Sequence, residues 1–153
     1  MVIEYRTEIN DSYRTIVIKD REIEYGTSCY DNPKDIVMMM NSIFRLDRLS
    51  EEYAYMLCLN SKCHLIGVFE ISHGTVNASF VSPRDVFMKA LLVGACRIVI
   101  VHNHPSGDNT MSNEDYEISQ KLKNSAEMIG VELLDFLIIG RDCYTSFEEI
   151  KIL

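Results

Sequence analysis

The stretch RIVIVHNHPSGDNTMSNED, residues 97–115, decides the fold and the chemistry of this chain. Residues 98–101 are all β-branched, which predicts a strand buried on both faces of a sheet. A polar loop containing proline and glycine follows. Ser112 then stands where a helix N-cap is expected, with acidic residues in the first helical turn. The stretch therefore predicts a strand, a loop and a helix in direct succession.

The end of this strand carries a candidate metal site. His102 and His104 are two residues apart, so an extended backbone points both imidazoles to the same face. A loop of this length can fold back and bring Asp115 to the same point. Two imidazoles and one carboxylate leave a fourth tetrahedral position open, as in catalytic rather than structural zinc sites. The same ligands also accept other transition metals, and Asp115 could simply stabilise the helix N-terminus.

The rest of the chain predicts a sheet with helices packed on it, an α/β or α+β fold. Cap-then-proline pairs at 32–33 and 82–83 each open a helix, the second running to about Ala95, and the helix capped by Ser112 ends near Gly130. Further strands are expected at 2–9, 13–19, 53–59, 64–72, 75–81, 131–140 and 143–147. We expect residues 1–32 to be an N-terminal strand elaboration of the same domain that residues 33–153 form.

Composition indicates one globular domain. The chain has 153 residues, of which 47% are hydrophobic and 25% are charged. The formal net charge of −8 makes a nucleic acid an unlikely direct partner. No apolar run is long enough to span a bilayer, and the N-terminus does not resemble a secretory signal. We therefore expect a cytoplasmic protein without a membrane segment.

The five cysteines predict reduced thiols instead of a disulfide framework. Their number is odd and they form no Cys-x-x-Cys pair, which also argues against a zinc site built from cysteines. Cys58 and Cys96 lie in apolar stretches and are expected to be buried.

Several strings resemble one known family. The string His-Asn-His-Pro-Ser-Gly at 102–107, followed by Ser112 and Asp115, resembles the JAMM motif His-x-His-Pro…Ser-x-x-Asp of JAB/MPN metallopeptidases. The Ser-Gly pair is typical of the RadC-like branch. Pro-Arg-Asp-Val-Phe at 83–87 and Asp-Phe-Leu-Ile-Ile-Gly at 135–140 resemble that branch in order and spacing. The resemblance covers residues 33–153 and implies a JAB1/MPN-like (cytidine-deaminase-like) fold.

The resemblance implies a role for each matching residue. His102, His104 and Asp115 would hold Zn²⁺, Glu70 would act as general base, and Ser112 would help to stabilise the oxyanion. The implied reaction is hydrolysis of a peptide or isopeptide amide bond in a protein or peptide substrate.

Two positions depart from the family pattern. Met111 stands where the family commonly has proline, and Phe136 stands where it commonly has histidine. Neither position is a metal ligand in the motif. The departures therefore concern the rigidity of the loop and local substrate contacts more than the metal.

Two other classes of function stay open. MPN-type folds also serve as non-catalytic binding modules, although no ligand of the motif is missing here. RadC-like proteins carry a DNA-repair label, so an accessory role in DNA repair or mobile-element biology is a further alternative. The letters of residues 102–104 suggest an HNH nuclease only by coincidence, because those nucleases disperse the residues over a ββα element. The substrate, the native metal and the oligomeric state stay open.

Overall fold

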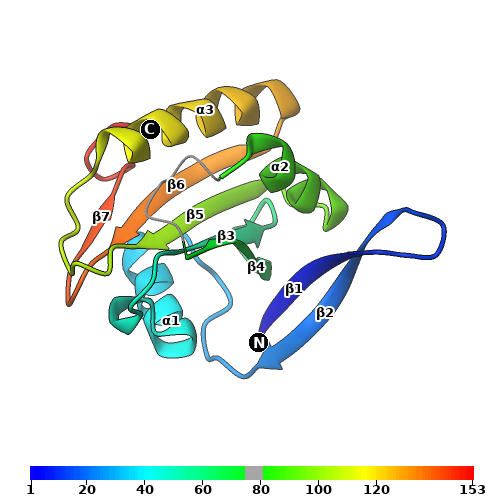
Figure 1. The fold of residues 1–153 in the computed structure, drawn as a ribbon, viewed down its shortest axis with the longest axis horizontal. Helices are drawn as coiled ribbons and strands as arrows, with labels where there is room; N and C mark the ends of the chain where they lie inside the picture. Colours follow the sequence, from blue (N-terminus) through cyan, green and yellow to red (C-terminus); the bar gives the residue numbers. More distant parts are fainter. Residues whose placement is uncertain (75–80) are drawn as a thin grey trace.

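A seven-stranded mixed sheet forms the centre of the protein, with helices on both faces (Figure 1). The structure is a computed structural model that describes residues 1–74 and 81–153. In these residues the strand order is β2-β1-β4-β3-β5-β6-β7, where β1/β4 and β5/β6 are parallel and the other neighbours antiparallel. The elements are β1 (Val2–Ile9), β2 (Thr15–Ile23), α1 (Pro33–Phe44), the 3₁₀ helix η1 (Leu46–Arg48), β3 (Tyr53–Leu59), β4 (Leu65–His73), α2 (Pro83–Leu92), β5 (Arg97–Asn103), α3 (Asn113–Ile129), β6 (Glu132–Ile139) and β7 (Tyr144–Ser146). The predicted fold class is confirmed.

The central strand β5 is buried on both faces, as its β-branched residues predict. Ile98 and Ile100 pack into the hydrophobic cluster beneath α2 and α3, whereas Val99 and Val101 pack into the cluster beneath α1. All four side chains are fully buried. Burying one such side chain stabilises the fold by roughly 1.5–3 kcal/mol, so this strand anchors both layers of the core.

Capping residues set the first turns of the helices as predicted, with one exception. The Asn32 side chain accepts a hydrogen bond from Asp35 N at 3.0 Å and opens α1. Ser82 precedes α2 but its side chain makes no capping bond. α2 also ends at Leu92, earlier than the predicted end near Ala95, because Gly94 adopts a left-handed conformation with φ of 69°. The predicted strand at 75–81 lies almost wholly outside the described residues.

The cysteines are free thiols, as predicted. Cys58 and Cys63 are buried. The prediction for Cys96 was wrong, because this side chain is exposed at the turn that leads into β5. The apolar residues around it differ in burial: Leu91 and Leu92 at the end of α2 are also exposed, whereas Ala95 and Ile98 are buried.

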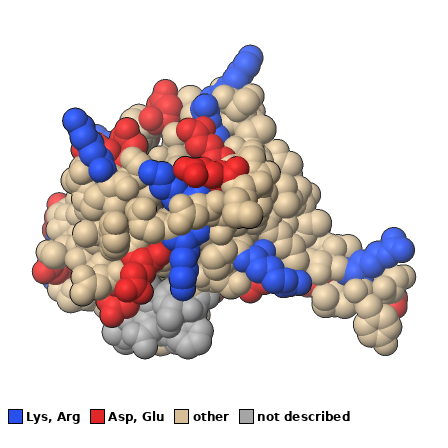
Figure 2. Space-filling view, turned by 90° about the horizontal axis from the view of Figure 1, so that it is seen from above, with Lys and Arg blue, Asp and Glu red and all other residues tan. Residues whose placement is uncertain are grey.

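The β1–β2 hairpin projects from one edge of the sheet (Figure 1). β2 begins at Thr15, later than predicted, because Tyr13 lies in the turn with a left-handed φ of 57°. On the face seen in Figure 2, basic and acidic side chains are interspersed and do not form one basic patch. Among the described residues, no helix combines the length and apolar composition that crossing a bilayer requires.

Candidate metal centre

The candidate site lies where β5 ends and α3 begins. His102 pairs with Ala54 in the β3–β5 ladder, and Ala54 belongs to the cluster beneath α2 and α3. His102 therefore faces the α3 side of the sheet, and the alternation of strand side chains directs Asn103 to the other side. Asp115 is the third residue of α3, so the first turn of that helix brings its carboxylate to the imidazoles.

Backbone hydrogen bonds fold the loop between His104 and α3 back along β6. His104 N donates to Ile139 O, Gly107 N donates to His104 O and Arg141 N donates to Gly107 O, each at 2.9 Å. Gly107 has φ of 84°, a conformation that glycine adopts without the strain a side chain would cause. The start of α3 therefore returns to the end of β5.

The side chain of Asn109 ties the same loop to β7. Its Nδ2 donates to Tyr144 O at 2.7 Å, and the Thr145 hydroxyl donates to Asn109 O at 2.7 Å. These bonds hold the loop to β7 two residues before Met111, the position where the family commonly has proline. They restrain the loop although Met111 lacks the ring of a proline.

Both imidazoles approach the carboxylate of Asp115. His102 Nε2 lies 3.1 Å from Asp115 Oδ1, and His104 Nε2 lies 3.4 Å from Asp115 Oδ2. Neither contact has hydrogen-bond geometry, and His102 Nε2 is a buried nitrogen that has no hydrogen-bond partner among the described residues. Such orphaned buried atoms are uncommon and call for an explanation.

These three side chains fit a metal ion. For bonds of 2.0–2.1 Å in a tetrahedral site, neighbouring ligand atoms lie about 3.3 Å apart. The observed separations of 3.1 and 3.4 Å lie on either side of that value. An ion at this point would also satisfy the orphaned His102 Nε2. The donor set of two nitrogens and a carboxylate suits zinc and related transition metals better than calcium or magnesium.

The second nitrogen of each ring has its own partner. His104 Nδ1 lies 2.9 Å from the backbone carbonyl of Asp108, and His102 Nδ1 lies 3.2 Å from Oε1 of Glu52. Because both partners are acceptors, we assign the ring proton to Nδ1 in each case. That tautomer leaves both Nε2 atoms as lone-pair donors toward the point next to Asp115. Metal-binding histidines usually have such partners, which orient the rings.

Glu52 is a site residue that the sequence analysis missed. Glu52, His102 and His104 can each offer one ligand atom, with all three atoms within 4.8 Å of one another. The Glu52 side chain is mostly buried, at 16% exposure. The available signal was an acidic residue immediately before the buried strand 53–59, but only the pairing of β3 with β5 shows that it meets His102.

Glu70, the predicted general base, lies elsewhere. It pairs with Tyr55, which belongs to the cluster beneath α1, whereas His102 faces the opposite side of the sheet. Its side chain is 43% exposed, and its carboxylate lies 3.9 Å from Nδ1 of His73. The structure therefore does not bring Glu70 together with His102 and His104.

Ser112 and Asp115 form a capping box at the start of α3. Ser112 Oγ accepts a hydrogen bond from Asp115 N at 3.0 Å, and Asp115 Oδ2 accepts one from Ser112 N at 2.8 Å. The carboxylate is thus held by the helix terminus while it faces the imidazoles. The interpretation of Asp115 as a helix-capping acid is compatible with its predicted role as a metal ligand, because one carboxylate can cap the helix and face the imidazoles at the same time.

The electrostatics of the cluster favour an ionised carboxylate. Burial alone would raise the pKa of Asp115, but the imidazoles of His102 and His104 outweigh burial and hold its pKa well below the usual range. Burial would lower the pKa of His102, yet the carboxylates of Asp115 and Glu52 raise it. Asp115 is therefore anionic at neutral pH, as a metal ligand must be.

Phe136, one of the two departures from the family pattern, packs beside His102. It is buried, and its ring lies edge-on to His102 with centroids 5.4 Å apart. It also packs on Phe147 at 4.9 Å. At this position the aromatic ring supports His102 from within the core.

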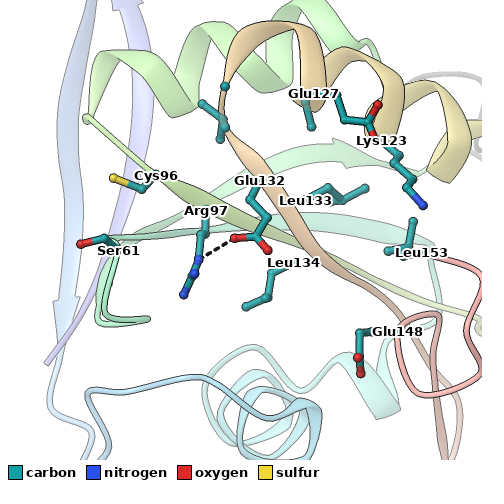
Figure 3. A pocket seen from close by; sticks show the side chains of 13 residues that line it. Ser61, Cys96, Arg97, Lys123, Glu127, Glu132, Leu133, Leu134, Glu148 and Leu153 are labelled. Atoms are coloured by element: carbon teal, nitrogen blue, oxygen red, sulfur yellow. Dashed lines mark hydrogen bonds and ion pairs between the residues drawn. The ribbon is translucent and has the colours of Figure 1, made fainter.

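One hollow of the described residues is remote from these histidines. It has a volume of about 710 Å³ and lies at the other end of β5 and β6, beside the end of α3 (Figure 3). An ion pair between Arg97 and Glu132 crosses it, at 2.6 Å. Its remaining charged lining residues are Lys123, Glu127 and Glu148. The polar cluster, not the size of the hollow, marks the candidate centre.

Comparisons with known proteins agree on one family. Residues 30–152 match the model of the RadC-like JAB domain. A UPF0758 protein of Clostridium tetani (strain Massachusetts / E88) is 41% identical over 122 residues, which cover 80% of this chain and 53% of that protein. A UPF0758 protein of Thermotoga maritima is 43% identical over 129 residues, which cover 84% of this chain and 57% of that protein.

The chain spans about half the length of the curated relatives it matches. The family model nevertheless covers all of the chain from the start of α1 to its last residues, including both histidines and Asp115. This protein belongs to the RadC-like JAB domain family.

Proposed function

We propose that the chain is a zinc-dependent hydrolase of the JAMM type that cleaves a peptide or isopeptide amide bond. The observation that carries this proposal is the convergence of two Nε2 atoms on the ionised carboxylate of Asp115 without hydrogen bonds among them. Membership of the RadC-like JAB domain family supports it.

His102, His104 and Asp115 would hold the zinc ion in this proposal. When bound, such an ion supplies Lewis acidity and makes water a nucleophile near neutral pH. The His102 side chain is 5% exposed and that of Asp115 is 2% exposed, whereas His104 is 18% exposed. A substrate would therefore approach from the His104 side.

We assign the acid–base role to Glu52 in place of Glu70. A general base must lie within hydrogen-bond reach of the proton it takes, directly or through one water. Glu52 has a carboxylate oxygen within 4.8 Å of a ring nitrogen of each histidine, a separation that one water can bridge. The Glu52 carboxylate contacts His102 at 3.2 Å, while Glu70 contacts the exposed His73. In the resting state Glu52 accepts the Nδ1 proton of His102, and during turnover it would take a proton from water and pass it to the leaving amine.

Ser112 fits the role of oxyanion donor. Its Oγ accepts from Asp115 N, so its own hydrogen can still be donated. A hydroxyl fixed at a helix N-terminus can stabilise the negative charge that develops on the carbonyl oxygen.

The substrate in this proposal is a peptide or protein. The net charge of −8 and the mixed charges seen in Figure 2 disfavour an uncomplexed nucleic acid as direct partner. Salt-sensitive binding of duplex DNA in a mobility-shift assay would contradict this part of the proposal.

Metal content tests the proposal directly. Purified wild-type protein should carry about one zinc ion per chain by mass spectrometry of the elements, as a single catalytic site requires. His104→Ala should lose it. His64→Ala is the control, because this exposed histidine lies at the β3–β4 turn and should keep the metal. A metal-free wild type at neutral pH would contradict the proposal.

Two glutamine variants test the acid–base assignment. With a fluorescence-quenched peptide library as substrate, Glu52→Gln should lower turnover by roughly 10²–10⁴-fold, the contribution of a general base. Glu70→Gln should leave turnover within about twofold, as expected of an exposed group remote from the chemistry. The opposite ranking would return the role to Glu70. Zinc binding without hydrolysis by the wild type would favour a non-catalytic binding module.

A further inference from the structure

Asn103, the residue between the two histidines, has a side chain that the proposed chemistry does not use. It is 1% exposed, and strand alternation directs it to the side of the sheet opposite both imidazoles. A buried carboxamide is costly unless its donor and acceptor are both satisfied. The partners of Asn103 therefore indicate what the residue does.

The Asn103 carboxamide bridges two backbone groups of one segment. Its Oδ1 accepts from Tyr53 N at 2.7 Å, and its Nδ2 donates to Glu51 O at 3.0 Å. These two groups flank Glu52. On the side facing β4, Gly74 N donates to Glu52 O at 2.9 Å, so the peptide units around Glu52 are held from both neighbouring strands.

Asn103 acts where the regular ladder stops. The pairing of β3 with β5 runs from Leu59↔Arg97 to Ala54↔His102, and the Glu51–Tyr53 segment lies beyond it. A side-chain amide carries the same donor and acceptor as a peptide unit. The Asn103 side chain thus continues the β3–β5 hydrogen bonding by one more step.

We infer that Asn103 is a positioning residue that fixes the Glu51–Tyr53 backbone so that Glu52 meets His102 Nδ1 and His102 Nε2 is set toward the metal position. The link from Glu52 to His102 is the contact of 3.2 Å. This inference rests on the proposed metal centre and adds how the centre is held. Asparagine suits the role because aspartate lacks the donor for Glu51 O and alanine lacks both groups.

Zinc affinity, measured by competition with a chromogenic chelator, distinguishes two roles of Asn103: positioning Glu52 and His102, or only stabilising the folded protein. Changes behind a ligating histidine weaken metal binding by roughly 10–100-fold. Asn103→Ala and Glu52→Ala should each do so. If Asn103 acts through Glu52, the double variant should be no weaker than the weaker single variant, within about threefold. A general loss of stability would instead make the two effects multiply.

Asn60→Ala is the matched control. The Asn60 side chain also binds two backbone groups, accepting from Lys62 N at 2.9 Å and His64 N at 3.1 Å in the β3–β4 turn. Its loss should leave zinc affinity unchanged. Asn103→Ala with wild-type affinity, or with an effect that multiplies with Glu52→Ala, overturns the inference.

A second variant and a second measurement cover the remaining outcomes. If Asn103→Ala does not fold, Asn103→Asp keeps the shape and the acceptor for Tyr53 N but loses the donor to Glu51 O, and it should also weaken zinc binding by roughly tenfold or more. Zinc affinity equal to wild type in that variant overturns the inference. A wild type that binds no zinc contradicts the proposed function instead. The role of Asn103 in holding the Glu51–Tyr53 backbone is then tested by hydrogen exchange. Exchange of the Tyr53 amide should become faster in Asn103→Asp or Asn103→Ala, while exchange of the Met56 amide should not change.

Discussion

Two buried carboxylates lie in different regions of the molecule and have opposite charge preferences. Asp115 opens α3 and is 1% exposed, and Asp135 lies in β6 and is 4% exposed. The imidazoles of His102 and His104 keep the pKa of Asp115 below its usual range. The pKa of Asp135 is raised, because burial outweighs its hydrogen bonds.

The two pKa values shift in opposite directions because the two carboxylates have different neighbours, since both are almost fully buried. Asp135 accepts hydrogen bonds from the Ser146 hydroxyl at 2.5 Å and from the backbone of Phe136 and Glu148 at 2.7 and 3.0 Å. All three donors are neutral, and those of Ser146 and Glu148 tie β6 to β7 and to the segment after it. Asp115 instead faces two side chains that can carry positive charge or hold a cation. Burial alone therefore does not make an acid a candidate metal ligand, whereas burial next to paired imidazoles does.

The largest expected effect is the loss of zinc binding when Asp115 is removed. Asp115→Ala should abolish zinc binding, because it removes one of the three proposed ligands. It also removes an acid from the helix N-terminus, which should lower the free energy of unfolding of the metal-free protein by roughly 0.3–2 kcal/mol. Elemental analysis and urea unfolding measure the two effects. Glu114→Ala, an exposed acid of the same turn, should keep the metal. If Asp115→Ala retained zinc, Asp115 would not be a zinc ligand, and the proposed difference between Asp115 and Asp135 would be wrong.

A smaller effect, on the pH dependence of folding stability, is expected for Asp135. Because the pKa of Asp135 is raised in the folded protein, the folded state binds more protons than the unfolded state between the ordinary aspartate value of about 3.9 and the raised value. Its contribution to stability is therefore present at low pH and is lost as pH rises through that window.

Asp135→Asn tests this sign. The asparagine oxygen can still accept from the backbone of Phe136 and Glu148, and its amide can donate to Ser146 Oγ. Urea unfolding across the acid range should show a smaller loss of stability with rising pH than the wild type does. Identical pH profiles of the two proteins would show that Asp135 does not titrate as inferred. Zinc affinity at neutral pH should not change in this variant.

The smallest effect is expected where charges are exposed. Arg97 and Glu132 form an ion pair at 2.6 Å, but their side chains are 32% and 55% exposed, so water screens the attraction. Glu132→Gln should change the free energy of unfolding by less than about 1 kcal/mol, and less still in high salt. Thermal unfolding at two salt concentrations measures this. A larger loss of unfolding free energy would mean that the Arg97–Glu132 ion pair is needed to hold together the hollow shown in Figure 3.

Much of the fold could be predicted because its signals are local. The β-branched run at 98–101 forms the central strand, and Asn32 and Ser112 cap the helices that their positions indicate. The end of α2 and the exposure of Cys96 could not be predicted in this way. Both depend on how the turn at 93–96 packs between two elements, which composition does not show.

The sequence by itself determined the part of the site that lies within fourteen residues: two histidines on one face of a strand and an acid in the first turn of the next helix. Only the tertiary structure decided which distant acid joins them. Strand side chains alternate, so the pairing register decides which face of the sheet each residue occupies. Glu70 pairs with Tyr55, on the side opposite His102. Glu52, 50 residues from His102 in the chain, reaches it because β3 and β5 are neighbours.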